Sequence, residues 1–286
     1  MEKKRPLFFS ISLFFRTFVA MKQAMILAAG LGTRLKPLTD TMPKALVPVG
    51  GVPLLDWNIR RLRAAGYGHF VVNVHHFARM IEEHVSRQDY APAVHFSDET
   101  EQLLETGGAL KKAAPLFSDD QPILIHNVDI LDNVDYDWFA RQHHDDEDGV
   151  LLVSRRKTTR YLLFDNSMRL MGWKNVTTGE VKSPFPWLRV SDFTIDEHLE
   201  VQAAPGSPLY AHRSSLHAFA FSGIHTFSPR LFPLMARFPQ RFGIIDFYLG
   251  ICHRSRIFGC LKDDLRVLDV GKLESLEHAE QFLNNK

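Results

Sequence analysis

The sequence predicts an α/β protein with a mainly parallel central sheet and helices on both of its faces. Short apolar runs alternate with amphipathic segments over residues 24–153, a pattern typical of parallel strands connected by helices. The first apolar run leads directly into a glycine-containing turn. The 286 residues, of which 45% are hydrophobic and 23% charged, have an ordinary globular composition.

The expected elements follow one another as short segments of contrasting pattern. The segment at residues 54–65, for example, has apolar side chains at helical spacing and stops at Gly66. Strands are expected by the same patterns at residues 24–28, 69–74, 93–96, 123–126, 150–153, 215–222 and 267–270. Further helices are expected at residues 78–85, 108–114, 138–144, 229–236, 246–251 and 273–283.

The alternation of strands and helices weakens after Ser154. Residues 155–215 are polar and are interrupted by prolines, and short strands are expected within them at 161–164 and 169–173. We therefore expect one nucleotide-binding domain over residues 23–286, in which residues 155–215 form a β-rich insertion on the substrate side.

Residues 1–22 are expected to lie outside this domain as an N-terminal extension. Three basic residues at positions 3–5 precede an apolar run, as in an export signal, but Arg16 interrupts the run before it could span a membrane. A dispensable extension, or a start codon assigned too early, fits better, because Met21 opens a segment typical of cytosolic α/β enzymes. We expect a cytoplasmic protein that does not associate with a membrane.

Charge balance and cysteine content argue against several classes of protein. The 34 basic and 33 acidic residues give a net charge of +1, without the excess of positive charge that is typical of proteins that bind nucleic acids in bulk. Cys252 and Cys260 cannot build a disulfide framework and suit a reducing compartment. The histidine pairs at 75–76 and 143–144 lack the spacing of a zinc site. The sequence leaves the formation of a homo-oligomer open.

Small residues and two cations follow the first strand. The small residues, which let a ligand approach the backbone closely, are Ala28, Ala29, Gly30 and Gly32. Thr33 and Arg34 come next, and Lys44 stands further on between two prolines. The segment matches neither the Walker A pattern nor the three-glycine Rossmann pattern, so the glycines alone favour a plain tight turn. The two neighbouring cations shift the interpretation towards phosphate binding.

The segment LAAGLGTRLKPLTDTMPKALVPV resembles the signature of the sugar-1-phosphate nucleotidyltransferases. The matching positions are Gly30, Gly32, Thr33, Arg34, Pro37, Leu38, Thr39, Pro43, Lys44, Leu46, Pro48 and Val49. The resemblance implies a Rossmann-like fold of the GT-A type and a nucleoside triphosphate bound over the glycine loop, from Ala28 onwards. It also implies that Arg34 and Lys44 hold the triphosphate and the reacting phosphoryl groups, and so act in catalysis.

Two aspartates far apart in the sequence lie close to the ends of expected strands. Asp129 follows the strand at 123–126, with Asn127 before it, and Asp269 lies within the strand at 267–270. Either residue alone is more often a helix cap or a loop residue. Two carboxylates brought together are suitable for Mg²⁺, which keeps phosphate and water oxygens as its other ligands. The resemblance implies that Asp129 and Asp269 are the Mg²⁺ ligands, that Asp129 is catalytic and that Asn127 contacts the substrate.

Two further glycine motifs resemble segments of the same family. Gly107 and Gly108 stand at the start of an expected helix, where they fit either a flexible helix entry or close approach of a base or ribose. The resemblance implies contact with the nucleoside. Residues 221–229 resemble the family segment that lines the sugar pocket, and there Gly223 would contact a sugar hydroxyl.

The chain departs from the family at the cation expected to hold the sugar phosphate. The usual Glu-Lys-Pro motif is absent, and Lys174 occupies about the right place. Arg155, Arg156 and Lys157 compete with it, and each of these side chains is more often a solvated surface cation.

The resemblance implies a reaction between a nucleoside triphosphate and a sugar 1-phosphate that yields a nucleotide sugar and pyrophosphate. Over residues 24–284 the chain is most similar to short bacterial enzymes that use UTP and N-acetylmuramate 1-phosphate in cell-wall recycling. Mannose-1-phosphate guanylyltransferase, which uses GTP, is the close alternative. A non-catalytic sensor of sugar nucleotides is a third reading, but it would be expected to lack Arg34, Lys44 or one of the aspartates, and all are present.

Overall fold

The computed structural model describes residues 21–190, 192–209 and 215–284. Most of the expected N-terminal extension, residues 1–20, lies outside the described residues, and Lys22 already begins the first strand. Within the described ranges, no helix has both the length and the apolar character that crossing a bilayer requires.

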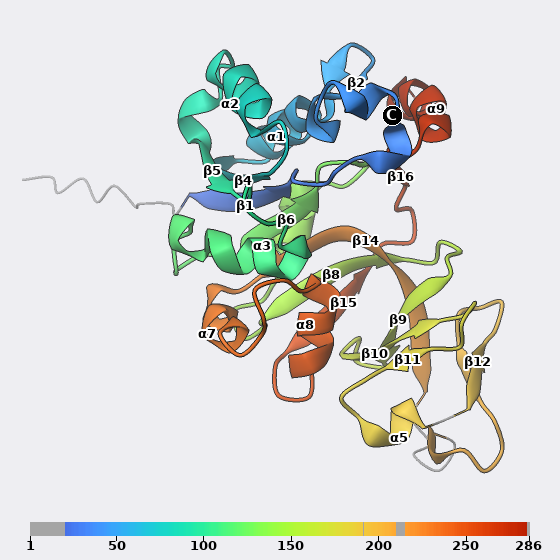
Figure 1. Cartoon of the computed structure of the whole chain (residues 1–286). Helices are drawn as coiled ribbons and strands as arrows, with labels where there is room; N and C mark the ends of the chain where they lie inside the picture. The colour runs from blue at the N-terminus through green and yellow to red at the C-terminus, as the bar shows by residue number, and fades with distance from the viewer. Residues whose placement is uncertain (1–20, 191, 210–214, 285–286) are drawn as a thin grey trace, which may run out of the picture.

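A ten-stranded mixed sheet forms the centre of the molecule (Figure 1). Its first part is parallel: β1 (Lys22–Leu27) lies between β4 (Tyr67–Val74) and β6 (Ile123–Asn127), and β5 (Val94–Asp98) pairs with β4 at the edge. These strands are rich in apolar residues because the sheet is covered on both faces. Their carboxyl ends meet at one edge of the sheet, where ligands usually bind in open α/β folds.

The long strand β14 (Leu216–Phe227) joins this parallel part to an antiparallel part. It pairs antiparallel with β6, with β8 (Gly149–Ser154) and with β9 (Arg160–Asp165). Beyond β9, β10 (Leu170–Asn175) and β11 (Val181–Lys182) extend the sheet, while β15 (Ile257–Leu261) runs parallel to β8. The first residues of β14 thus lie in one half of the molecule and its last residues in the other.

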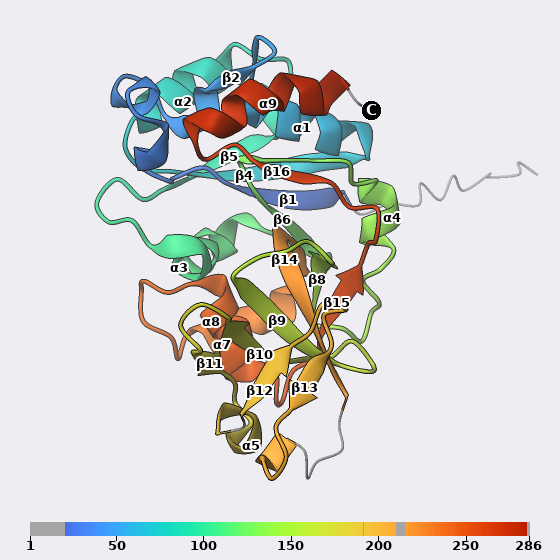
Figure 2. The ribbon, with the colours of Figure 1, turned by 90° about the vertical axis from the view of Figure 1, so that its right-hand side faces the viewer.

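Helices cover both faces of the sheet (Figures 1 and 2). Met25 enters one apolar core, together with residues of α3 (Glu105–Ala113), α7 (Phe232–Met235) and α8 (Ile244–Ile251). Its neighbours Ala24 and Ile26 enter the other core, because successive side chains of a strand point to opposite faces. That second core is closed by α1 (Leu54–Ala64), α2 (Ala78–Ser86), α4 (Tyr136–Ala140) and α9 (Leu273–Asn284). The mixed sheet between two helical layers confirms the predicted fold class.

The described residues of 155–215 form short elements. After β9, β10 and β11 come α5 (Pro186–Arg189) and a two-stranded ribbon of β12 (Phe193–Ile195) and β13 (Val201–Ala203). Because β9 pairs with β14, the segment is continuous with the central sheet at that edge. Its boundaries as an insertion stay a prediction.

Several elements differ from the expected ones in extent. The helix expected at 138–144 is α4, which starts earlier because the Asp135 carboxylate caps it by accepting from the N–H groups of Asp137 and Trp138. The helix expected at 229–236 is a 3₁₀ turn, Pro229–Leu231, followed by α7. The patterns missed β15, and they missed three short strands that periodicity cannot detect. These are β2 (Pro48–Val49), its partner β3 (Val52–Pro53), and β7 (Ile130–Asp132), which pairs with β16 (Val267–Asp269), the strand expected at 267–270.

Candidate active site

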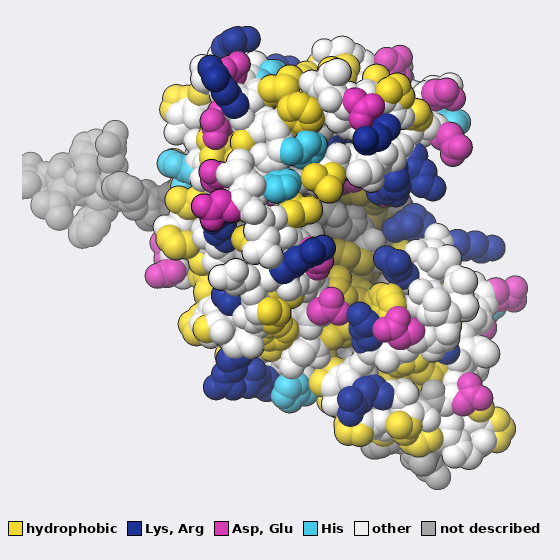
Figure 3. Space-filling model, in the orientation of Figure 1, with side chains coloured by type: hydrophobic (Ala, Val, Ile, Leu, Met, Phe, Trp, Pro, Cys, Tyr) yellow, Lys and Arg dark blue, Asp and Glu magenta, His cyan; other side chains and the backbone are white. Residues whose placement is uncertain are grey.

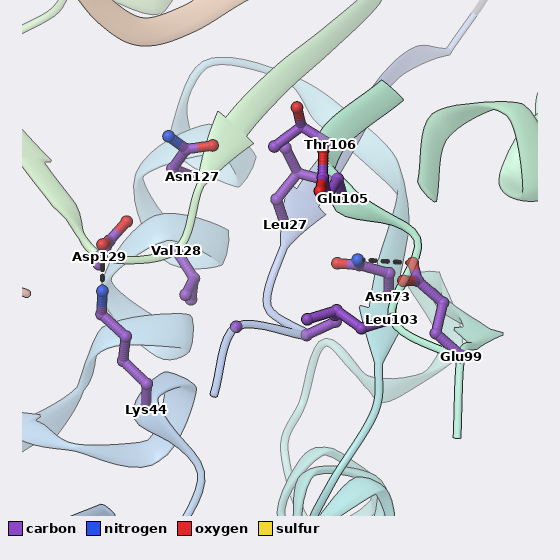
Figure 4. Close-up of a pocket in the computed structure, with 12 residues that line it drawn as sticks. Leu27, Lys44, Asn73, Glu99, Leu103, Glu105, Thr106, Asn127, Val128 and Asp129 are labelled. Carbon is purple, nitrogen blue, oxygen red and sulfur yellow. Dashed lines mark hydrogen bonds and ion pairs between the residues drawn. The ribbon is translucent and has the colours of Figure 1, made fainter. Parts of the chain in front are cut away.

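A cavity of about 240 Å³ opens at the carboxyl ends of β1, β4 and β6. Leu27 ends β1, Asn127 ends β6, and Asn73 lies one residue before the end of β4. Figure 4 shows these side chains around an open space, together with Lys44 and Asp129. The cavity lies where the topology of an open α/β sheet places a ligand.

The residues that follow β1 form one wall of the cavity. Ala29 and Gly30 both line it. The N–H of Ala28 donates to Oδ1 of Asn73 over 2.7 Å, which ties the start of the loop to β4. This arrangement brings Ala29 and Gly30 to the cavity, whereas Ala28 and Gly32 do not line it. Nucleotide contact by these small residues stays a prediction.

Gly32 holds the loop in a conformation that other residues would strain. Its φ is 64°, and a Cβ at this position would lie 2.8 Å from Cγ2 of Thr39. Thr33 begins a 3₁₀ turn, Thr33–Leu35, directly after it. The turn leaves the Arg34 side chain 56% exposed and 4.0 Å from the carboxylate of Asp269.

Lys44 is a buried cation in the cavity wall. It begins a 3₁₀ turn, Lys44–Leu46, and its side chain is only 10% exposed. Its ammonium group forms an ion pair with Asp129, whose side chain is 18% exposed (Figure 4). A buried charge is tolerated when it is paired. Because both residues also line the cavity, the pair can exchange part of its mutual contact for a charged ligand.

The fold brings the two predicted aspartates together. Asp269 on β16 pairs with Ile130 on β7, and the N–H of Val270 donates to the carbonyl of Asp129 over 2.8 Å. Gly271 closes the arrangement, because a Cβ there would lie 2.4 Å from Oδ1 of Asp269. Residues that are 140 positions apart thus meet through a strand pair of three residues each.

Asp129 and Asp269 are suitable for a metal that arrives with its ligand. No group of three or more His, Cys, Asp or Glu side chains forms a closed metal site within the described ranges. Mg²⁺ usually takes one or two carboxylates and completes its shell with phosphate and water oxygens. Lys44 and Arg34 stand beside the two carboxylates, as expected where the other ligands are anionic.

Asn127 and Gly223 also meet at this edge. Gly223 lies in a shift of register in β14, with φ of 83°. A Cβ there would lie 2.7 Å from Nδ2 of Asn127, so glycine leaves room for the amide. The structure brings these two predicted sugar-side residues into contact, and their binding role stays a prediction.

Gly107 and Gly108 have a packing role in the first turn of α3. Both N–H groups donate to the carbonyl of Phe242, over 2.9 and 3.1 Å. A Cβ at Gly108 would lie 2.1 Å from the carbonyl oxygen of Gln240, and one at Gly107 would overlap the Phe242 ring. The two residues that precede them, Glu105 and Thr106, line the cavity instead. Nucleoside contact by the glycines themselves stays a prediction.

Sequence patterns missed a buried acid at the far end of the cavity. Glu99 is fully buried, accepts from Nδ2 of Asn73 over 2.8 Å, and accepts from the N–H of Leu104 over 3.0 Å. Both Asn73 and Glu99 line the cavity (Figure 4). The available signal was Asn73, a polar residue that interrupts the apolar run from Phe70 to Val74.

Lys174 lies in β10, outside the lining of this cavity. Its ammonium group donates to the carbonyl of Phe193 and lies 3.8 Å from the centre of the Phe193 ring. Burial lowers the pKa of Lys174, and the charge of Asp192 opposes this. Contact with a sugar phosphate stays a prediction, and it requires this side chain to leave Phe193.

The comparisons with known proteins agree with this geometry. Residues 23–161 match the nucleotidyl transferase family. An N-acetylmuramate α-1-phosphate uridylyltransferase of Caulobacter vibrioides is 48% identical over 115 residues, which are 39% of this chain and 47% of the relative. Residues 23–161 thus carry a nucleotidyl transferase domain. A mannose-1-phosphate guanyltransferase of Emericella nidulans is 33% identical over 144 residues, 49% of this chain and 39% of the relative.

The match to the nucleotidyl transferase family lies in the first part of the chain, at residues 23–161. The matched regions span less than half the length of both curated relatives. Solved structures extend the likeness in fold alone. A UDP-glucose pyrophosphorylase complexed with UDP-glucose has a TM-score of 0.66 at 15% identity, covering 93% of this chain and 99% of the other. HddC from Yersinia pseudotuberculosis, complexed with GMP-PN, has a TM-score of 0.59 at 20% identity, covering 92% of this chain and 100% of the other.

Proposed function

We propose that this chain transfers a nucleotidyl group from a nucleoside triphosphate to a sugar 1-phosphate, with UTP and N-acetylmuramate 1-phosphate as its substrates. The observation that carries the reaction class is the pairing of Lys44 with Asp129 and of Arg34 with Asp269 beside the cavity. The choice of sugar and base rests on two relatives named N-acetylmuramate α-1-phosphate uridylyltransferase, at 48% and 42% identity over 115 residues each.

In the proposed reaction an oxygen of the sugar phosphate attacks the α-phosphorus in line. The bond from that phosphorus to the bridging oxygen breaks, and its electron pair leaves with pyrophosphate. Such a transfer depends on positioning and on charge stabilisation rather than on a covalent enzyme intermediate. The backbone at Ala29 and Gly30 would hold the phosphates, and Lys44 and Arg34 would neutralise the charge that develops on the leaving pyrophosphate.

Mg²⁺ is the cofactor that we propose for this reaction. Asp129 and Asp269 would hold it together with phosphate oxygens. Bound there, it would supply charge neutralisation for the reacting phosphates. Because the reaction consumes a nucleoside triphosphate, we propose the cytoplasm as its location.

GTP with mannose 1-phosphate is the second candidate pair. It rests on the relatives named mannose-1-phosphate guanyltransferase, which match a longer stretch at lower identity. A catalytically silent sensor is disfavoured by the presence of Arg34, Lys44, Asp129 and Asp269 around one cavity edge.

The test is release of pyrophosphate in the presence of Mg²⁺. Four nucleoside triphosphates are each combined with the 1-phosphates of N-acetylmuramate, mannose, glucose and N-acetylglucosamine. Rapid release with UTP and the muramate is expected. Release with GTP and mannose 1-phosphate would replace the proposed pair, while nucleotide binding without release across the panel would favour the sensor.

A further inference from the structure

A second cavity lies on the sugar side of the molecule, between β9, β10 and α8. Its volume is about 340 Å³, and its wall includes Arg156, Arg160 and Lys182. Trp173 and Phe221 contribute aromatic surface to the same wall. In the space-filling view, Lys and Arg side chains gather around the hollow between the two halves of the molecule (Figure 3).

Two contacts connect the lining of this second cavity with that of the proposed active site. Phe221 lines the second cavity and lies two residues before Gly223, which packs against Asn127 of the first cavity. On the other side, the N–H of Ile244 at the start of α8 donates to Oγ1 of Thr106 over 2.9 Å, and Thr106 also lines the first cavity. Two stretches of chain, Phe221–Gly223 and the start of α8, thus connect the linings of the two cavities.

The charges of the second cavity are unbalanced. Lys182 forms an ion pair with Asp246, the one acidic residue in the described lining, over 3.0 Å. Arg156 donates to the carbonyl of Phe221 over 3.2 Å, and within the described ranges neither Arg156 nor Arg160 has a carboxylate within 4.0 Å in an ion pair. Two guanidinium groups in the same lining as aromatic surface match a ligand that is part apolar and part anionic.

We propose that Arg156 and Arg160 bind a carboxylate carried by the sugar, separate from its 1-phosphate. This inference rests on the proposed function, because N-acetylmuramate differs from N-acetylglucosamine by a lactyl ether that ends in a carboxylate. The guanidinium plane suits a carboxylate because it can donate two parallel hydrogen bonds. Trp173 and Phe221 provide flat surface for the apolar face of a pyranose. The site would thus select the 1-phosphates of sugars that carry a carboxylate over those of sugars that carry none.

The test compares two sugars that differ only in the lactyl group. Affinities for N-acetylmuramate 1-phosphate and N-acetylglucosamine 1-phosphate are measured by calorimetry on the full chain saturated with a non-hydrolysable UTP analogue and Mg²⁺. Arg160→Gln and Arg156→Gln are each expected to weaken muramate binding roughly tenfold or more, and to change binding of the neutral sugar less than about twofold. Arg160→Lys should restore part of the loss, because it keeps the charge but not the planar fork.

Arg189→Gln is the matched control, because Arg189 is an exposed arginine of α5 that does not line either cavity. Equal losses for both sugars would overturn the proposal and assign the arginines to the 1-phosphate. Unchanged muramate binding in both glutamine variants would overturn it as well, while pyrophosphate release by the unmodified chain would leave the proposed function intact. An unmodified chain that neither binds nor converts either sugar would overturn both proposals.

Discussion

Lys44 contacts a partner that lies 85 positions further along the chain, and the pair forms part of the cavity wall. Side chains of this kind contribute to catalysis when they are held in place before the substrate arrives. Burial restricts the Lys44 side chain, and the ion pair with Asp129 offsets the cost of burying it.

Lys44→Ala is expected to reduce pyrophosphate release at least about 100-fold, because it removes a cation positioned for the transferring phosphates. Circular dichroism should show a folded protein. Lys36→Ala is the control, since Lys36 is 60% exposed and pairs with Asp40 on the surface. Near-normal turnover in Lys44→Ala would refute the assignment of this residue.

Gly223→Ala tests whether the space beside Asn127 matters. The alanine must adopt φ of 83°, which costs about 1–2 kcal/mol, and its Cβ must displace Nδ2 of Asn127. We expect lower thermal stability and a raised KM for the sugar 1-phosphate. Gly179→Ala provides the comparison, because Gly179 has φ of 75° but no atom within 4 Å of an added Cβ. An equal KM for the sugar 1-phosphate in the two variants would contradict a role of Asn127 in substrate binding.

At the scale of elements, a buried polar network supports the turn between β6 and β7. The Asp132 side chain is fully buried and accepts from Tyr136 over 2.9 Å, while Arg61 lies 3.0 Å away and the His126 ring 3.2 Å. Burial disfavours the charged carboxylate, but His126 and Arg61 outweigh it and hold the pKa of Asp132 below its ordinary value. The network thus fixes the turn that carries Asp129.

Asp132→Ala is expected to lower the free energy of unfolding by about 3–5 kcal/mol, because it leaves Arg61 largely buried without its carboxylate. Urea denaturation measures the effect. Asp263→Ala should cost less than about 1 kcal/mol, because Asp263 is 74% exposed and pairs with Arg155 on the surface. A similar loss of unfolding free energy in both variants would show that the buried network stabilises the fold no more than a surface ion pair does.

At the scale of the whole molecule, β14 crosses from one half to the other and carries a buried histidine. Burial lowers the pKa of His225 to about 3, and the neighbouring His126 adds to this. Neither ring nitrogen has a hydrogen-bond partner within the described ranges, and the ring packs edge-on against Tyr248. The folded protein therefore keeps His225 neutral where the unfolded chain protonates it.

The sign of the pH effect follows from this difference. Below a pH of about 6.5 the unfolded chain gains a proton at His225 that the folded chain does not gain. The free energy of unfolding therefore decreases as the pH is lowered, by up to about 1.4 kcal/mol per pH unit, until about pH 3. His225→Leu should hardly change the free energy of unfolding at pH 7.5. Between pH 6.5 and pH 4, urea denaturation should show a weaker dependence of this free energy on pH than in the unmodified chain. Parallel pH profiles would contradict the burial of a neutral imidazole.

Local patterns in the sequence were enough to predict most strands of the parallel half, the glycine loop and the charged residues near it. These features depend on near neighbours, because strand burial and tight turns impose composition over a few residues. The signature around Arg34 and Lys44 also predicted the nucleotidyl transferase match found over residues 23–161.

Only the tertiary structure brought Asp269 next to the neighbour of Asp129 and placed Asn127 against Gly223, because these arrangements depend on β16 meeting β7 and on the register of β14. It also gave Gly107 and Gly108 a packing role against the chain at 240–242, and it placed Glu99 in the cavity. Such contacts join segments far apart in the chain, and no local periodicity records which distant backbone a residue will meet.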